Sequence, residues 1–168
     1  EELFSRYAEI PALLSLTPKL NVVITDVETM KEEDFAQYKQ LLSALATEVE
    51  KRYVSGQSPQ LNLLTDRMLL ENPNHCNAGW ESITVGADGS LRVCPGFEET
   101  VGDVWKGLEL KNPQLYRLDH APICRVCDAW QCRRCVLLNR KTTYEVNTPS
   151  HEQCVSAHLE RNASRNLF

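Results

Sequence analysis

The sequence contains no run of about 18 apolar residues, so no segment is predicted to cross a membrane. Its first residues, EELFSRYAEI, show neither the basic region nor the apolar core of a secretory signal peptide. Basic residues are not in surplus either, because 18 Lys and Arg stand against 23 Asp and Glu. A nucleic-acid-binding face normally carries excess positive charge. We therefore expect a cytoplasmic protein that binds neither a membrane nor a nucleic acid.

Cysteine is absent from residues 1–75, and all seven cysteines fall within residues 76–168. Four of them crowd into the stretch CRVCDAWQCRRC, residues 124–135. An odd number leaves at least one thiol outside any complete set of intramolecular disulfides. Since no secretory marker is present, metal binding is the favoured use, and disulfides or redox-active thiols are the alternatives. The candidate metal ligands are Cys76, Cys94, Cys124, Cys127, Cys132, Cys135 and Cys154.

Residues 1–75 are predicted to form a β-α-β unit. The run LNVVITDV (20–27) is typical of a buried strand, and QLNLLTDR (60–67) is expected to form a second one. A helix between two such strands predicts one crossover of a parallel sheet. Two strands make no complete sheet. Either further strands come from outside this chain, or the unit packs against the second half.

The helix of this unit has a clear apolar face. Apolar residues recur at helical spacing from Phe35 to Tyr53. Thr29 and Glu32 have the spacing of a capping box before the helix, and Gly56 is suited to end it.

Both predicted strands end in Thr-Asp, at Asp26 and Asp66. Ligands bind at the carboxyl ends of parallel strands, so the two carboxylates are candidates to line a cleft. Capping the following turn is the alternative role, and we favour it.

The second half is predicted to combine a β-hairpin with helices. ESITVGADGSLRVCP (81–95) has two short β-prone runs around a turn at Gly89. A short helix is expected before the cysteine cluster, and a longer one after Ser150, which is a suitable N-cap. The fold class expected for the whole chain is therefore α+β.

The spacing of the cysteines leaves two kinds of metal site open. Two CxxC pairs are typical of a zinc site, but paired zinc knuckles usually lie about 15–20 residues apart, and only four residues separate the pairs here. In two-cluster ferredoxins, the last cysteine of a dense run reaches a second cluster. Such a division would split the seven thiolates into four and three.

The pattern resembles the SPASM domain, the C-terminal extension of radical SAM enzymes that mature peptides. The first half of its signature is matched by Cys76 and Gly89, with twelve residues between them, and by Cys94 after four more residues. The second half is matched by Cys124-x2-Cys127 and by the lone Cys154. The spacings of four and two residues around Cys132 depart from the usual five and three. More narrowly, the segment CDAWQCRRCVLLNRKTTYEVNTPSHEQC resembles the maturases of CXXX-repeat peptides.

This resemblance covers residues 76–168 and implies two auxiliary [4Fe–4S] clusters. It assigns Cys124, Cys127, Cys132 and Cys154 to one cluster, and Cys76, Cys94 and Cys135 to the other. The three-cysteine cluster would need a fourth ligand, for which a side chain such as His75 or a substrate thiolate is suited. The altered spacing leaves open an exchange of Cys132 and Cys135 between the clusters.

The resemblance also implies that the two halves of the chain belong to different domains of an enzyme. Residues 1–75 would be the last β-α-β portion of a partial radical SAM barrel, and residues 76–168 the auxiliary domain. The motif CxxxCxxC, which binds the cluster that cleaves S-adenosylmethionine, is absent from the sequence. We therefore expect S-adenosylmethionine to act only through the rest of the barrel, and this chain alone to be inactive. The implied partner is a Cys-rich precursor peptide; the alternative is a non-catalytic zinc module that binds a peptide.

Several other residues near the cysteines have a functional and a structural interpretation. The tryptophans would shield clusters or simply pack in the core, and the basic residues would offset thiolate charge or form an ordinary surface. The histidines would ligate or hydrogen-bond, and Asp128 would accept a proton or stabilise a turn, which we favour. These residues are Trp80, Trp105, Trp130, Arg125, Arg133, Arg134, Arg140, Lys141, His120, His151 and Asp128.

Overall fold

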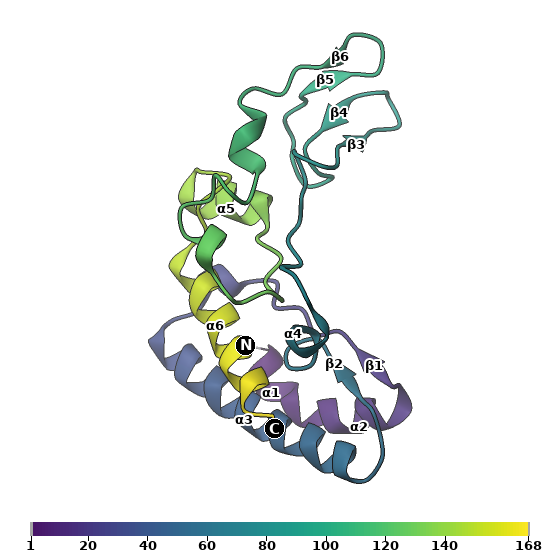
Figure 1. Cartoon of the computed structure of the whole chain (residues 1–168), viewed down its shortest axis with the longest axis vertical. Coiled ribbons are helices and arrows are strands. Elements are labelled where there is room, and N and C mark those ends of the chain that lie inside the picture. Colours follow the sequence, from purple (N-terminus) through teal and green to yellow (C-terminus); the bar gives the residue numbers. More distant parts are fainter. Residues whose placement is uncertain (1, 168) are drawn as a thin grey trace. The chain divides into compact units, whose positions relative to one another are not determined.

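The computed structural model describes residues 2–167 and is a mixed α+β structure (Figure 1). The chain divides into two compact units. The first unit consists of residues 1–74, Asp128–Cys132 and His151–Phe168, and the second of His75–Cys127 and Arg133–Ser150. Compactness does not identify evolutionary modules, so the expected boundary between residues 75 and 76 stays a prediction.

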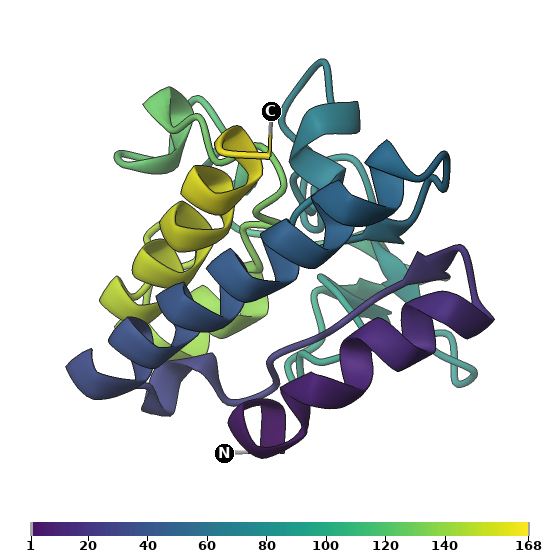
Figure 2. The same ribbon diagram turned by 90° about the horizontal axis from the view of Figure 1, so that it is seen from below.

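The first unit is built around one long helix. Its elements are α1 (Glu2–Arg6), η1 (Tyr7–Glu9), α2 (Ile10–Leu16), β1 (Lys19–Leu20), η2 (Val27–Thr29), α3 (Glu32–Val54), β2 (Gln60–Leu61), α4 (Asp66–Leu69) and α6 (His151–Arg165). Helix α6 packs beside α3 (Figure 2). The core contains the predicted apolar face of α3, joined by residues of α2, the 61–64 turn and the C-terminus.

The ends of α3 show one wrong prediction and one confirmed. The capping box does not use Thr29 and Glu32: Lys31 is the N-cap, and its backbone N–H donates to the Asp34 carboxylate at 2.8 Å. Thr29 instead donates to the carbonyl of Asp26 and ends a turn of 3-10 helix. Gly56 follows the helix at φ +84°, a conformation that favours glycine, as predicted.

The predicted parallel crossover is confirmed, but its strands are much shorter than expected. Strands β1 and β2 pair in parallel, with Leu20 opposite Leu61. After this pair, the Asn62 side chain takes the place of a backbone partner: it accepts from the N–H of Val22 and donates to its carbonyl, both at 2.8 Å. The Thr65 hydroxyl then bonds both the N–H and the carbonyl of Leu61 and closes a turn. The strand predicted over residues 60–67 therefore ends at Leu61.

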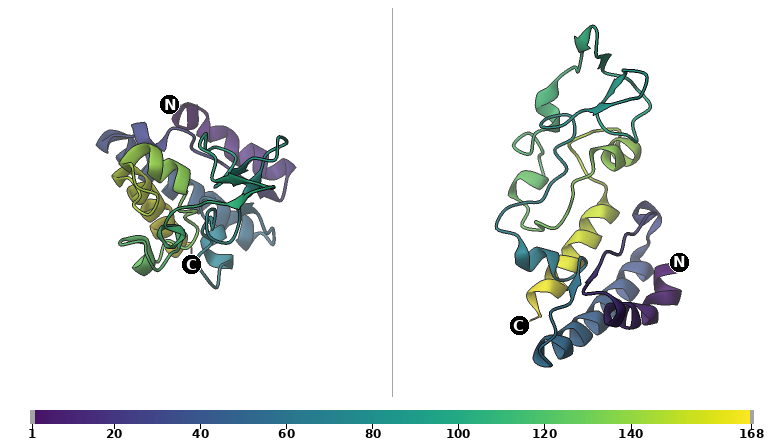
Figure 3. Two further views of the ribbon diagram at one scale, coloured as in Figure 1. Left: turned by 90° about the horizontal axis from the view of Figure 1, so that it is seen from above. Right: turned by 90° about the vertical axis from the view of Figure 1, so that its right-hand side faces the viewer.

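The second unit is built from small hairpins and short helices. Its elements are β3 (Thr84–Val85), β4 (Leu91–Arg92), β5 (Gly102–Asp103), β6 (Gly107–Leu108), η3 (Pro113–Tyr116), η4 (Cys124–Val126) and α5 (Val136–Thr143). The predicted hairpin β3–β4 is confirmed, whereas the hairpin β5–β6 was not predicted from sequence. The two hairpins lie side by side within this unit (Figures 1 and 3).

The two helices predicted in the second half lie where they were expected, whereas α5 was not predicted. The short helix expected before the cysteine cluster is the 3-10 turn η3, and α6 begins directly after Ser150. Within the part of the chain that the structure describes, no helix has the length and apolar character needed to cross a bilayer.

Candidate metal centre

Two predicted ligands of the second unit pack against one small apolar core, and a third directly precedes one of its residues. This core consists of Ala78, Val93, Phe97, Tyr116 and Val136. Cys76 and Cys94 pack against it, and Cys135 directly precedes its buried residue Val136. The backbone N–H of Cys76 also donates to the carbonyl of Arg133 at 2.6 Å, two residues before Cys135. The thiols separated by up to 59 positions in sequence thus belong to one packed region.

The glycine between Cys76 and Cys94 has a structural reason. Gly89 turns the chain from β3 to β4 at φ +79°. An added Cβ there would lie 2.7 Å from the ring of Trp105, so a larger residue would displace this side chain as well as strain the backbone. The turn sets the pairing of β3 with β4, and β4 leads directly to Cys94.

The segment between Cys132 and Cys135 is held by a buried arginine. Arg134 is 1% exposed and adopts φ +47°, and its guanidinium donates to the carbonyls of Tyr116 and Arg117. The interpretation of Arg134 as a surface residue is therefore wrong: it ties the CRRC turn to the chain after η3. The other four basic residues near the cysteines, Arg125, Arg133, Arg140 and Lys141, are exposed.

The first CxxC pair forms a tight turn. Cys124 and Cys127 flank the 3-10 turn η4, and the N–H of Cys127 donates to the carbonyl of Cys124 at 3.1 Å. Cys124 is buried and Cys127 is half-buried. Such a compact CxxC turn is the local geometry used by thiolate knuckles in metal sites.

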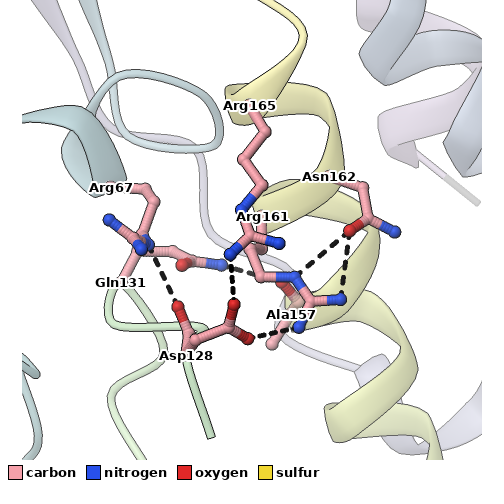
Figure 4. Close-up of polar contacts among 7 residues, drawn as sticks. All are labelled: Arg67, Asp128, Gln131, Ala157, Arg161, Asn162 and Arg165. Carbon is pink, nitrogen blue, oxygen red and sulfur yellow. Dashed lines mark hydrogen bonds and ion pairs between the residues drawn. The ribbon is translucent and has the colours of Figure 1, made fainter.

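The other two predicted ligands, Cys132 and Cys154, belong to the first unit. Cys132 ends the segment Asp128–Cys132, and Cys154 lies in the first turn of α6. The side-chain amide of Gln131 donates to the carbonyl of Ala157 at 2.8 Å, which places the segment against α6 (Figure 4).

Two arginines of α6 hold the start of this segment. The carboxylate of Asp128 accepts hydrogen bonds from Arg161 and Arg165, one on each oxygen (Figure 4). On α4, Arg67 donates to the carbonyl of Asp128 at 3.0 Å and stacks over the ring of Trp130 at 4.2 Å. The hydrogen bond from Arg161 holds the pKa of Asp128 below its usual range, which disfavours the predicted alternative of a proton acceptor. Asp128 anchors the segment rather than merely stabilising a turn.

Helix geometry extends this contact to Cys154. Positions 154, 157, 161 and 165 fall on one stripe of a helix with 3.6 residues per turn. The segment therefore contacts the same stripe that carries Cys154, and Gln131 is bonded about one turn away from it. Within the first unit, the fold brings the chain around Cys132 toward the face of Cys154.

A half-buried carboxylate lies behind this contact. Glu160 accepts a hydrogen bond from the Tyr38 hydroxyl of α3 at 2.8 Å and a second from Gln131. Burial raises the pKa of Glu160 to about 7, although both hydrogen bonds oppose this shift. The sequence analysis missed Glu160, Arg161 and Arg165; their spacing along α6 marks a helix face but does not identify the segment that covers it.

The remaining candidates take structural or surface positions. Trp105 is 78% exposed and Trp80 is 47% exposed, so neither is a core residue, whereas Trp130 is half-buried under Arg67. His120 is exposed, and the exposed His151 contacts the ring of Phe35 edge-on. Asp26 lines a surface pocket of about 880 Å³ in the first unit, and Asp66 is not among its lining residues. The two carboxylates therefore do not share this pocket; Asp66 opens helix α4.

The donor chemistry of these regions suits a thiophilic metal or an iron–sulfur cluster, because the candidate ligands are seven cysteine thiols that form no disulfide. Across residues 2–167, however, no three Cys, His, Asp or Glu side chains already converge on one metal position. Ligation would therefore require side chains to turn, as is common where metal binding completes folding. Comparisons with family models, with curated proteins and with solved structures find no match to this chain.

Proposed function

We propose that this chain is the auxiliary iron–sulfur portion of a radical SAM peptide maturase that modifies a Cys-rich ribosomal precursor peptide. The observation that carries the proposal is the packing of Cys76 and Cys94 against one core, together with the hydrogen bond from the N–H of Cys76 to Arg133, two residues before Cys135; both support the assignment of the three cysteines to one site. The turn at Gly89 supports it further, because it accounts for the glycine in the signature between the first two cysteines.

Two ligand sets follow from this proposal. Cys76, Cys94 and Cys135 would hold one [4Fe–4S] cluster with an open fourth position, for which His75 or a substrate thiolate is a candidate ligand. Cys124, Cys127, Cys132 and Cys154 would hold the other. When bound, such clusters supply electron acceptance and a docking point for a thiolate.

The residues of the chain itself would then position and protect the ligands. The ion pairs of Asp128 with Arg161 and Arg165 would keep the segment that ends in Cys132 against α6. The buried Arg134 would hold the turn before Cys135. S-adenosylmethionine would bind to the remainder of a radical SAM barrel, which is therefore an expected partner along with the peptide.

A second candidate function is a non-catalytic zinc module that binds a peptide. The tight turn between Cys124 and Cys127 favours it, because this geometry serves zinc knuckles equally well. Zinc and iron–sulfur ligation compete for the same thiolates, so metal analysis separates the two candidates.

The test is to measure iron, zinc and acid-labile sulfide per chain after anaerobic reconstitution. We expect about eight iron and eight sulfide, with broad absorbance near about 400 nm. Cys76→Ser and Cys154→Ser should each lose about half of the iron, whereas the exposed Ser55→Ala should lose none. Bound zinc without sulfide uptake would contradict the maturase proposal and leave the zinc module.

A further inference from the structure

The two hairpins of the second unit are separate two-stranded sheets that one antiparallel bridge links. Ser90 of the first hairpin bridges Asp103 of the second, and the N–H of Val104 donates to the carbonyl of Gly89 at 3.0 Å. The strands therefore follow one another in the order β3, β4, β5 and β6. In this antiparallel arrangement, residues opposite each other share a face.

Register places one apolar row across all four strands. Val85 lies opposite Leu91, and Gly102 lies opposite Leu108. The bridge between Ser90 and Asp103 places Leu91 next to Gly102. The row is thus Val85, Leu91, Gly102 and Leu108, which we call the tip row. Gly102 adds no side chain to it.

The tip row is left open to solvent. Val85 is 60% exposed and Leu108 is 53% exposed, and Leu91 is half-buried. Two residues beyond Leu91, just past the end of β4, Val93 is 2% exposed and belongs to the apolar core. The apolar face therefore continues past the edge of the core without a covering element among the described residues of this unit.

An aromatic side chain is held beside this row. Trp105 is 78% exposed at the turn between β5 and β6, yet its ring lies against Gly89 of the neighbouring turn. Its backbone N–H donates to the Asp103 carboxylate at 2.9 Å, so the turn that carries the ring is fixed. A positioned and exposed tryptophan is typical of an interface anchor.

The segment that carries the row is acidic. Residues 81–109 contain six acidic and two basic residues, a net charge of −4, and five of the acidic residues are exposed. The acidic residues are Glu81, Asp88, Glu98, Glu99, Asp103 and Glu109, and the basic ones are Arg92 and Lys106. A partner for this surface must supply positive charge together with apolar side chains.

We infer that the tip row and Trp105 form a docking surface for an extended basic segment of another protein, which pairs with the edge of β6. Strand β6 has β5 as its partner on one side, so its other edge offers unpaired backbone groups within the described sheet. Apolar residues at alternate positions of the segment would contact Leu108 and Trp105, and lysines or arginines would face the acidic surroundings. This surface lies beyond the proposed function and needs no bound cluster.

The test is fluorescence anisotropy of the full chain with a labelled peptide of about ten alternating lysine and valine residues. A matched peptide with glutamate in place of lysine is the control. We expect saturable binding of the basic peptide alone, weakened by salt. Equal binding of both peptides, or no binding of the basic one, would overturn the inference.

Variants locate the binding and guard against misfolding. Trp105→Ser should weaken binding about tenfold, while Val54→Ser, at an 84% exposed site in the first unit, should leave it unchanged. Lys106→Glu should tighten binding severalfold, a gain that misfolding cannot produce. If Trp105→Ser has no effect, or if Trp105 proves to mediate dimerisation in ultracentrifugation, another occupant holds the surface and the inference fails. Measurements on metal-free and reconstituted protein distinguish this failure from failure of the cluster proposal.

Discussion

In the first unit, a 23-residue helix runs through a cluster of eleven buried apolar residues, whereas the second unit has an eight-residue helix as its longest and a cluster of five. Small domains bury too little apolar surface to fold readily without disulfides, metals or partners. Five of the seven cysteines belong to the second unit. The comparison teaches that apolar burial suffices for the first unit, and that the second should depend on what its thiols bind.

The largest expected effect comes from metal removal. If the thiols of the second unit hold a metal or cluster, chelation of reconstituted protein should lower the hydrogen-exchange protection of residues 76–123 at least about a thousandfold. Amides of α3 should keep their protection, since their core needs no metal. Mass spectrometry after exchange measures both regions in one sample. Equal loss of protection in both units would show that the first unit depends on the metal as much as the second does.

A core truncation in α3 should have the next largest effect. Leu45 is 2% exposed, so Leu45→Ala should cost about 2–5 kcal/mol of the free energy of unfolding. Leu16 is 83% exposed, and Leu16→Ala should change it by less than about 0.5 kcal/mol. Urea titration followed by circular dichroism measures the difference. Metal content per chain should stay unchanged in both variants; a loss with Leu45→Ala would show that metal binding depends on the core of the first unit, to which Cys132 and Cys154 belong.

The half-buried Glu160 should make the first unit sensitive to pH. Its pKa is about 7 in the folded state against an ordinary 4.5, so the folded state binds more protons between these values. Stability should therefore fall by about 1–3 kcal/mol as the pH rises from about 4.5 to 7. Glu160→Gln should remove this fall, whereas Glu50→Gln, at an exposed site of α3, should keep it. Urea midpoints at several pH values measure this pH dependence. If stability falls with pH in Glu160→Gln as it does in the unaltered protein, Glu160 is not its cause.

The smallest effect is expected at Asp128. Its ion pairs are partly exposed, so Asp128→Asn should cost about 1 kcal/mol at neutral pH. Because the folded state lowers the pKa of Asp128, this contribution is present above the ordinary carboxyl range and is lost as the pH falls through the lowered value. Asp119→Asn is the matched control, since Asp119 pairs with Arg117 at an exposed position of the second unit. A difference of zero between the two variants would leave the anchoring role of Asp128 unsupported.

The sequence allowed prediction of those elements whose signal is repeated many times. The buried apolar face of α3 runs over about four turns, from Phe35 to Val49, so the helix and its buried residues were predictable, as was the turn at Gly89. The second strand was predicted too long, because the side-chain bonds of Asn62 and Thr65 end the pairing, and single polar residues inside an apolar run give little warning. Hairpin β5–β6 has strands of two residues, below the length at which alternation is visible.

The candidate site divides in the same way. Cysteine spacing identified the ligand candidates and the glycine between them, but the residues that hold their loops come from distant positions. Asp128 and Arg161 are 33 positions apart, and nothing in their local sequence predicts that they meet. The buried Arg134 resembled its exposed neighbour Arg133 in sequence, and only its left-handed backbone and carbonyl partners distinguish it.

The order of the segments along the chain has a consequence for folding during synthesis. Three separate stretches make up the first unit, and its helix α6 comes last. On the ribosome, α3 would emerge more than a hundred residues before the helix that covers it, so the first unit is completed only when nearly the whole chain has been translated. Neither unit occupies one uninterrupted stretch of the gene. Cutting the chain between residues 75 and 76 would therefore separate α3 from α6, the helix that packs against it.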